Sequence, residues 1–167
     1  MRRKQKNLPF RRKKEGKTDY LSRRRLLQAG KPRLVVRKSS KNVLVQIVEF
    51  QENGDKVILT ATTKELQTKF GWDCARRNIP AAYLTGFLAG VKAKEKKLHE
   101  VVVDIGLQKA RKGSVLFAAV KGVLDAGLNT PHDAGMFPSE DRLVGKHIKF
   151  KNTSFDKVKE AITKQVK

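Results

Sequence analysis

The sequence predicts an α/β fold in which an antiparallel meander is extended into a mixed sheet and covered by helices. Two observations predict the sheet: β-branched runs separated by turn residues lie between positions 33 and 63, and a fourth such run lies near position 103. Apolar helical segments on either side of that fourth run predict the covering helices. We expect a basic N-terminal arm at 1–31, an α/β core domain at 32–130, and a C-terminal loop and helical extension at 131–167.

The arm is dominated by lysine and arginine. Residues 1–41 carry 17 basic residues against two acidic ones, a net charge of +15 out of +22 for the 167-residue chain. Its apolar content is too low to offset the entropy of ordering, apart from one or two helical turns around Leu21, Leu26 and Leu27. We expect the arm to be poorly ordered in isolation and to bind a polyanion.

Three short strands are expected after the arm. Arg33–Lys38 is β-branched and is bounded by Pro32 and by a Ser-Ser-Lys-Asn turn. The run 43–50 follows, and Asn53-Gly54 then gives a strong hairpin signal before the run 57–63. Strands joined by turns this short pair antiparallel, so we expect a meander.

Two helices follow the meander in the sequence. The first, at 64–70, is short and ends at Gly71. Asn78 then has the character of an N-cap, with Pro80 in the first turn of a helix that runs to about Lys97.

Small residues recur at every fourth position on the long helix and on a later one at 115–126, which Ser114 caps and Gly127 ends. They are Ala82, Gly86 and Gly90 on the first and Ala118, Gly122 and Ala126 on the second. Glycine inside a helix costs about 1 kcal/mol relative to alanine. We therefore expect these stripes to be surfaces of close helix packing.

The remaining elements complete the predicted fold. Val101–Ile105 is expected as the fourth strand, and its unbroken apolar start indicates burial on both faces. A loop is expected beyond residues 130–132, followed by a helix from Ser139 and an amphipathic one from about Ser154. The apolar seam of that last helix fits a contact with the domain itself, with another protein or with RNA, and consists of Phe155, Val158, Ile162 and Val166.

Sequence motifs give little support to an enzyme. Gly16-Lys17-Thr18 ends like a P-loop, but Arg11 stands where that motif needs a glycine. Gly16 more simply allows a tight bend. Asp104, near a strand end, fits either a metal-dependent ribonuclease or a structural acid that bonds a turn or an arginine. The second interpretation is favoured because the other acids show no convergent spacing, namely Glu49, Asp125 and Asp141.

Cysteine and histidine show no pattern typical of a metal site. Cys74 and the three histidines share no ligand spacing, so neither a metal nor another cofactor is expected. A single cysteine fits a reducing compartment, and no apolar run approaches the roughly 20 residues of a membrane span. We therefore expect a cytosolic protein without a membrane partner.

Three more basic clusters lie in predicted turns: Lys38 with Lys41, Arg76-Arg77, and Lys109 with Arg111-Lys112. The last two directly precede predicted helix N-termini, where free N–H groups favour phosphate. Each cluster alone fits a solvated turn, but together with the arm they indicate one nucleic-acid surface.

The kind of nucleic acid follows from what the sequence lacks. No sequence-reading module is visible, which favours a structured RNA recognised by shape and phosphate. Phe10 and Tyr20, placed among the arm's cations, either stack on unpaired bases or dock the arm. A nonspecific nucleic-acid-binding protein and a ribonuclease-like enzyme are the alternatives.

Longer stretches then resemble one known family. They are FRRKKEGKTDYLSRRRLL, KPRLVVRKSSKNV, NIPAAYLTGFLAG, VVVDIGLQKARKGSVLFAAVKGVLDAGLNTPH and FPSEDRLVGKHI. Together, and in this order, they are similar to the large-subunit ribosomal protein family that binds 5S ribosomal RNA, number eighteen in the universal series. The similarity runs from about Pro9 to Ile148, and the length looks like that of the archaeal form.

The resemblance implies a noncatalytic constituent of the large ribosomal subunit in the cytoplasm. It implies binding to 5S rRNA, which the protein helps to attach to the large-subunit rRNA in the central protuberance. It also implies contacts with neighbouring ribosomal proteins, including the other 5S-binding protein, and a ribonuclease H-like fold that lacks the acidic site. The RNA-binding residues carried over by similarity are Arg11, Arg12, Lys13, Lys14, Lys17, Thr18, Tyr20, Arg23, Arg24, Arg25, Arg33, Arg37, Lys38, Ser39, Asn42, Lys109, Arg111 and Lys112.

Overall fold

The centre of the protein is a four-stranded mixed sheet, seen in a computed structural model that describes residues 8–148 and 153–164. The strand order is β3-β2-β1-β4. β1 (Arg33–Lys38), β2 (Val43–Glu49) and β3 (Lys56–Thr62) pair antiparallel, and β4 (Val102–Asp104) lies parallel to β1. The predicted meander and mixed sheet are confirmed, and the ends of the first three strands agree within one residue.

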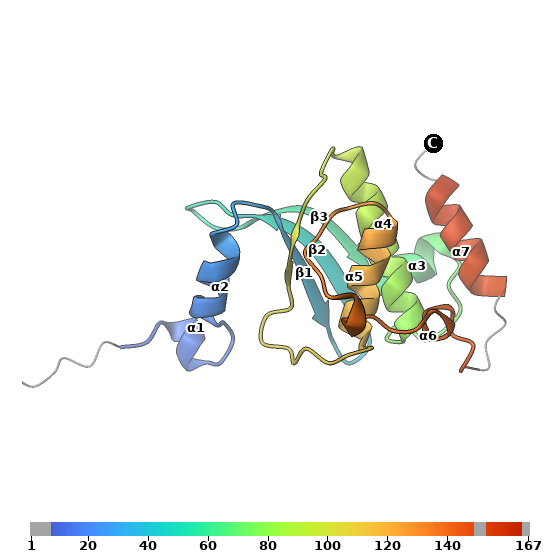
Figure 1. Cartoon of the computed structure of the whole chain (residues 1–167), viewed down its shortest axis with the longest axis horizontal. Helices are drawn as coiled ribbons and strands as arrows, with labels where there is room; N and C mark the ends of the chain where they lie inside the picture. The colour runs from blue at the N-terminus through green and yellow to red at the C-terminus, as the bar shows by residue number, and fades with distance from the viewer. Residues whose placement is uncertain (1–7, 149–152, 165–167) are drawn as a thin grey trace, which may run out of the picture.

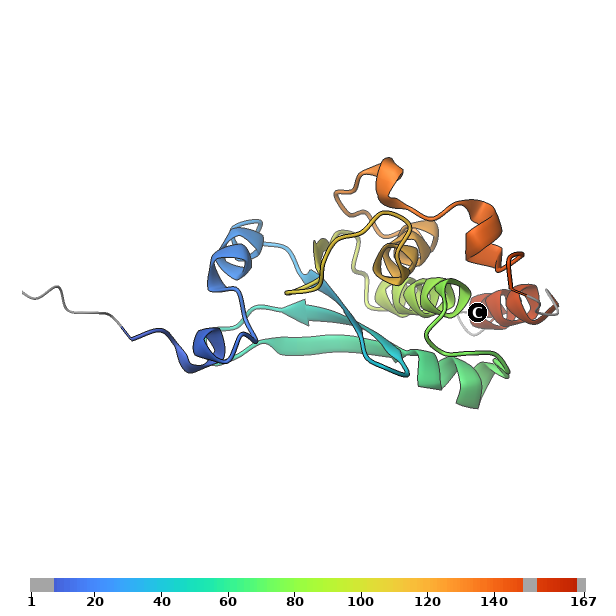
Figure 2. The ribbon, with the colours of Figure 1, turned by 90° about the horizontal axis from the view of Figure 1, so that it is seen from below.

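Helices cover one face of this sheet, and no helix of the described chain covers the other (Figure 2). α4 lies against β2 and β3, and α5 lies against β1. The arm forms two helices that project beyond one end of the sheet (Figure 1). The helices are α1 (Arg11–Lys14), α2 (Tyr20–Leu27), α3 (Thr63–Phe70), α4 (Ile79–Glu95), α5 (Val115–Asp125), the 3₁₀ helix η1 (Ala134–Met136), α6 (Glu140–Val144) and α7 (Thr153–Lys164).

Side-chain alternation along the strands fixes which face is covered. In β2, Val43, Val45 and Ile47 are completely buried, whereas Leu44 and Gln46 are partly exposed. A strand points successive side chains to opposite faces, so the apolar set meets α4 and the mixed set meets the open side.

Local signals set the helix ends. The Asn78 side chain accepts a hydrogen bond from the Ala81 N–H at 2.9 Å, which caps α4, and Pro80 lies in its first turn. Gly71 ends α3 in the left-handed conformation at φ +66°. Ser114 occupies the predicted N-cap of α5, but its hydroxyl makes no capping hydrogen bond.

The small-residue stripes are the surface where α4 and α5 meet. A Cβ added to Gly86 would lie 1.9 Å from the Ala119 carbonyl oxygen, and one on Gly122 would lie 2.1 Å from the Tyr83 carbonyl oxygen. The two helix backbones therefore touch, and only glycine fits at these positions. The predicted close packing is confirmed.

The last helix packs on the domain itself. Phe155, Val158 and Ile162 of α7 are buried, and α7 lies against α3 and α4. The Phe155 ring centroid lies 5.7 Å from that of Tyr83. Val166, the fourth member of the predicted seam, lies outside the described residues. Of the three contacts left open by the sequence, the structure shows the one within the domain.

The prediction that the fourth strand is buried on both faces is wrong. β4 comprises only Val102–Asp104, and all three residues are partly exposed. β4 is an edge strand that pairs with β1 alone, and its outer face has no helix of the described chain over it. Val101, just before the strand, is the residue that is completely buried.

An ion network joins the arm to the sheet. Arg33, a residue only 3% exposed, donates hydrogen bonds of 2.6 Å to Asp104 and to Asp55. Arg23 in α2 donates two hydrogen bonds of 2.8 Å, one to each carboxylate oxygen of Asp55. Asp104 also accepts the Gly106 N–H at 2.9 Å. The arm, the β2–β3 hairpin, β1 and β4 thus meet at one cluster of four charges.

Packing at the α4–α5 contact gives a testable prediction. Gly86→Ala should destabilise the protein by about 1–3 kcal/mol, because overpacking against fixed backbone outweighs the better helix propensity of alanine. Gly135→Ala is the control, since its added Cβ would lie 3.2 Å from the movable Asp133 carboxylate. Urea unfolding of both variants measures the difference. Equal stability of the two variants would contradict the close packing.

The ion network predicts a dependence on acid. The hydrogen bond from Arg23 lowers the pKa of Asp55 below 3.8; burial opposes this, and Arg33 adds to it. Because the folded pKa is the lower one, the stabilisation is complete above the unfolded pKa and is lost as pH falls through the folded pKa. Asp55→Asn should therefore flatten the loss of stability below about pH 4. Urea midpoints at pH 2.5 to 6 measure it, and an unchanged pH profile would refute it.

Candidate nucleic-acid interface

The arm folds into two short helices separated by a bend. Gly16 adopts φ +63°, as the predicted bend requires, and ends the turn that follows α1. Asp19 then caps α2, because its side chain accepts hydrogen bonds from the Leu21 and Ser22 N–H groups and from the Ser22 hydroxyl. These bonds lower the pKa of Asp19, with the Ser22 hydroxyl as the largest cause. The helical turns predicted near Leu21 are confirmed as α2.

Most of the arm's cations face solvent. Glu15 pairs with Arg11 at 3.0 Å and with Lys17 at 2.9 Å, and the Arg12 Nε donates to the Thr18 hydroxyl at 2.9 Å. Exposed pairs of this kind break at little cost when a phosphate competes. The other exposed cations of the two helices are Lys13, Lys14, Arg24 and Arg25.

Arg23 and Arg33 form ion pairs that the sequence did not predict. Both belong to the set carried over as RNA contacts, but both guanidinium groups face carboxylates in the ion network. Arg33 is buried at the floor of the arm–sheet groove, and its Nη1 and Nη2 groups donate to carboxylates. Asp104 is confirmed as a structural acid, since it bonds both an arginine and a turn. RNA contacts by Arg23 and Arg33 stay predictions, and in the free protein both residues attach the arm to the sheet.

Ser39 and Asn42 shape the turn between β1 and β2. The Ser39 N–H donates to the Asn42 carbonyl at 2.8 Å, and the Asn42 N–H donates to the Ser39 hydroxyl at 3.0 Å. This closed turn holds Lys38 and Lys41 exposed at the end of the sheet.

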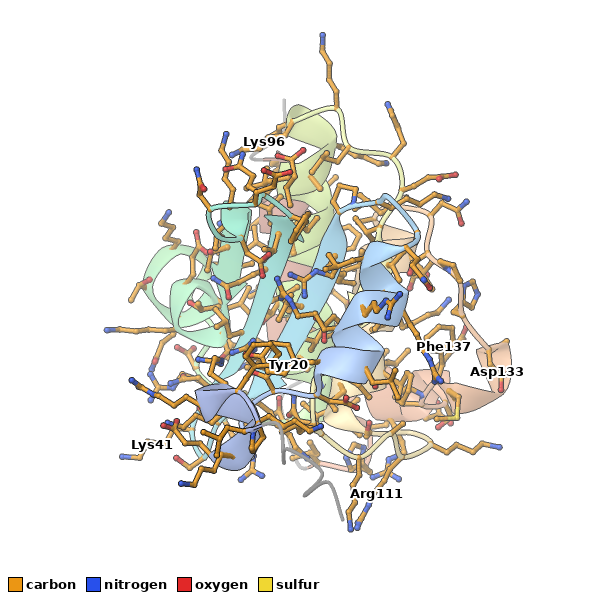
Figure 3. The ribbon with its side chains drawn as sticks, turned by 90° about the vertical axis from the view of Figure 1, so that its left-hand side faces the viewer. Tyr20, Lys41, Lys96, Arg111, Asp133 and Phe137 are labelled. Atoms are coloured by element: carbon orange, nitrogen blue, oxygen red, sulfur yellow. The ribbon has the colours of Figure 1, made fainter. Side chains whose placement is uncertain are left out.

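The structure brings the three basic clusters together around that turn. The Lys38 N–H donates to the Gln108 side chain at 3.3 Å, and Gln108 in turn donates to the Val36 carbonyl at 2.9 Å. This anchors the loop that carries Lys109, Arg111 and Lys112. On the other side, Arg77 donates to the Ser40 carbonyl at 3.4 Å. Figure 3 shows Lys41 and Arg111 at the same edge of the molecule.

The basic loop has a second support. The Gly113 N–H donates to the Met136 carbonyl at 2.9 Å, so η1 lies behind the loop. Both the β1–β2 turn and η1 therefore hold the loop that precedes α5. Sequence reasoning missed this contact, because its two partners lie 23 positions apart.

A groove of about 960 Å³ separates the arm from the sheet. Arg12, Lys17 and Arg25 line it from the arm, and Arg37 lines it from β1. Its three carboxylates have partners: Asp55 and Asp104 lie in the ion network, and Asp19 caps α2. The groove therefore presents a net positive surface to a ligand.

The two arm aromatics contact each other. The Phe10 and Tyr20 rings lie 5.0 Å apart and are tilted by 44°. Phe10 is 70% exposed, so this contact holds the arm's two helices together and leaves a ring face open. Docking of Phe10 onto the core is thus not seen, whereas base stacking stays a prediction.

Within the described ranges, no group of three or more histidine, cysteine or acidic side chains is arranged to hold a metal ion. The described helices also include none that is long and apolar enough to cross a membrane.

Comparisons with known proteins agree with this geometry. A family model described as "Ribosomal large subunit proteins 60S L5, and 50S L18" matches residues 4–98 and 90–133. The chain is 50% identical over 139 residues to large ribosomal subunit protein uL18 of Korarchaeum cryptofilum (strain OPF8), covering 83% of this chain and 71% of that protein. It is 51% identical over 139 residues to the uL18 protein of Caldivirga maquilingensis, covering 83% of this chain and 67% of that protein. The chain therefore belongs to this family of large-subunit ribosomal proteins.

Proposed function

We propose that the protein binds 5S rRNA and helps to attach it to the large-subunit rRNA. One observation carries the proposal: three turns from distant parts of the sequence gather their exposed cations around the β1–β2 turn, and cations of the arm face Arg37 of β1 across the groove. As a member of a large-subunit ribosomal protein family, the protein works in the cytoplasmic ribosome. It is a structural protein and not an enzyme.

The chemistry of this surface suits a folded RNA. Phosphates of a folded RNA are presented in several directions at once, and cations on a projecting arm and on a domain edge meet more than one of them. The N-terminus of α5 adds free backbone N–H groups directly after Arg111 and Lys112. Contacts of cations and backbone N–H groups with phosphates read shape and charge and carry no base sequence.

The groove between arm and sheet supports contact with an RNA backbone. Its cations lie on both walls, with Arg12 and Arg25 on the arm and Arg37 on β1. The phosphates of a single strand lying between them would be neutralised from two sides. Such a strand would therefore bind more tightly in the groove than on a flat basic surface.

A second basic region supports contact with another RNA. Lys94 and Lys97, near the end of α4, are exposed. The neighbouring Lys96 lies at the edge of Figure 3 opposite Lys41 and Arg111. A protein that joins two RNAs needs two separated basic surfaces, and we assign this end to the large-subunit rRNA. Contacts with neighbouring ribosomal proteins, including the other 5S-binding protein, belong to the same proposal.

Asp104, the residue on which the ribonuclease alternative depends, is engaged in structural contacts. Asp104 is committed to Arg33 and to the Gly106 N–H, and no other carboxylate of the described chain forms a metal-binding group with it. Two-metal cleavage needs several carboxylates that converge on the ions.

Binding to 5S rRNA is tested by electrophoretic titration against an RNA duplex of equal length at several salt concentrations. We expect tighter binding to 5S rRNA at every salt concentration, because only the folded RNA meets the arm and the turns together. Equal affinity for the two RNAs would contradict the proposal and indicate a nonspecific nucleic-acid-binding protein. Preference for double-stranded DNA would point to the other nucleic-acid class.

Removal of residues 1–30 tests how many of the phosphate contacts the arm makes. We expect the logarithm of affinity to depend much less steeply on the logarithm of salt, because each lost phosphate contact removes a slope of roughly 0.7–0.9. An unchanged slope after truncation would assign the phosphate contacts to the domain alone.

The basic loop is tested by Arg111→Gln combined with Lys112→Gln. We expect the salt slope for 5S rRNA to fall by about 1.4–1.8, which is two phosphate contacts. Lys157→Gln combined with Lys164→Gln is the matched control, since it removes the same charge from exposed positions on α7, at the end of the molecule away from the arm (Figure 1). Equal slopes for the two double variants would show that only net charge matters.

A further inference from the structure

We propose that Asp55 is a positioning residue, which fixes the direction of the RNA-binding arm before RNA arrives. Asp55 touches no candidate RNA-binding surface of its own; it acts through Arg23, which it holds by two parallel hydrogen bonds of 2.8 Å. The inference rests on the proposed function for its effect on RNA affinity. Its effect on the free protein does not depend on that function.

The arm has little else to hold it. Neither α1 nor α2 has a buried residue, and Leu21 is 60% exposed. Among the described elements, no extensive contact joins either helix to a strand or to another helix. The groove of about 960 Å³ separates the arm from the sheet where an apolar contact would otherwise lie. Lys31, which follows α2, also pairs with Glu100, so the ion network is the attachment that holds α2 itself.

The geometry of the network gives direction as well as attachment. A guanidinium that meets a carboxylate with two parallel hydrogen bonds has one preferred orientation, unlike a lysine ammonium. Asp55 is itself held from the other side by Arg33, which is buried and fixed by Asp104. Asp104 thus fixes Arg33, and Arg33 holds Asp55. Asp55 in turn sets the orientation of Arg23 in α2.

The charges of the network point to positioning and not to attraction. Two arginines and two aspartates sum to zero, so the cluster adds nothing to the positive field of the interface. Its use is to keep Arg12 and Arg25 on one wall of the groove while Arg37 stands on the other. A preformed groove avoids part of the ordering cost that a free arm would bear on binding.

Two acidic residues of the same hairpin allow a test with opposite signs. Glu52 is exposed in the turn next to Asp55 and has no ion pair among the described residues. If charge alone mattered, Asp55→Asn and Glu52→Gln would both strengthen RNA binding slightly. We expect Glu52→Gln to do so and Asp55→Asn to weaken 5S rRNA binding about tenfold, since the loosened arm must be ordered on binding. Strengthening by Asp55→Asn as large as that by Glu52→Gln would overturn the proposal.

A measurement without RNA separates this proposal from the proposed function. In the full-length free protein, Asp55→Asn should increase hydrogen exchange of the α2 amides, with the amides of β1 and β2 unchanged. Glu52→Gln should leave α2 at the level of the unaltered protein. Faster exchange in Asp55→Asn together with no preference for 5S rRNA would retain the positioning role and reject the RNA. Unchanged exchange in α2 would reject the positioning role, whatever RNA the protein binds.

A second pair of variants covers the case in which Asp55→Asn disturbs the core. Arg23→Gln leaves Arg33 with both carboxylates, and Arg24→Gln removes the same charge from the next residue, which is exposed. We expect Arg23→Gln to speed exchange in α2 without changing the salt slope. Arg24→Gln should instead lower the slope by roughly 0.7–0.9 and leave exchange unchanged. The reverse pattern would make Arg23 a phosphate contact and refute the proposal.

Discussion

The buried Arg33 guanidinium is the constraint on which the arrangement of the interface depends. A buried cation is tolerated only with carboxylate partners, and Arg33 has two, Asp55 from the β2–β3 hairpin and Asp104 from β4. Satisfying this one charge fixes the hairpin against the edge strand. Because Asp55 also accepts two hydrogen bonds from Arg23, the same ion network holds the arm. The polar side of the sheet is therefore organised by charge, while its other side is organised by apolar packing.

The helix-covered side of the sheet supports the basic residues of the interface. Contact between the backbones of α4 and α5 makes the covered side of the sheet rigid, and the termini of both helices are then fixed in place. Basic residues stand next to the first turn of each, at Arg77 before α4 and at Lys112 before α5. Cations mounted on a rigid core lose less freedom when they meet phosphate than cations on a loose loop. The chain has a net charge of +22, and this charge is balanced by the polyanion that the protein binds.

Local signals made much of the fold predictable from the sequence. The Asn53-Gly54 turn, the Asn78 cap and the four-residue spacing of Gly86 and Gly90 each act within a few residues, and the elements they predict are present. The burial of β4 was mispredicted because an apolar run does not reveal whether a strand lies at an edge. The ion network was also missed, since 71 residues separate Arg33 from Asp104. Asp104 alone carried a usable signal, as an acid near a strand end beside a turn.

A comparison within β1 shows why two arginines that look alike in the sequence are placed differently in the structure. Arg33 and Arg37 share one strand and one face, and composition cannot tell them apart. Yet Arg33 is buried and paired, whereas Arg37 is exposed and lines the groove. The β2 residue opposite each arginine is apolar, Val48 for Arg33 and Leu44 for Arg37, so the difference lies elsewhere: Arg33 alone donates to carboxylates, on the hairpin and on β4. In a chain with 38 basic and 16 acidic residues, most cations have no acid to pair with. Contacts with acids from distant parts of the chain, which spacing along the sequence does not reveal, therefore separate the buried arginine from the one that is exposed in the groove.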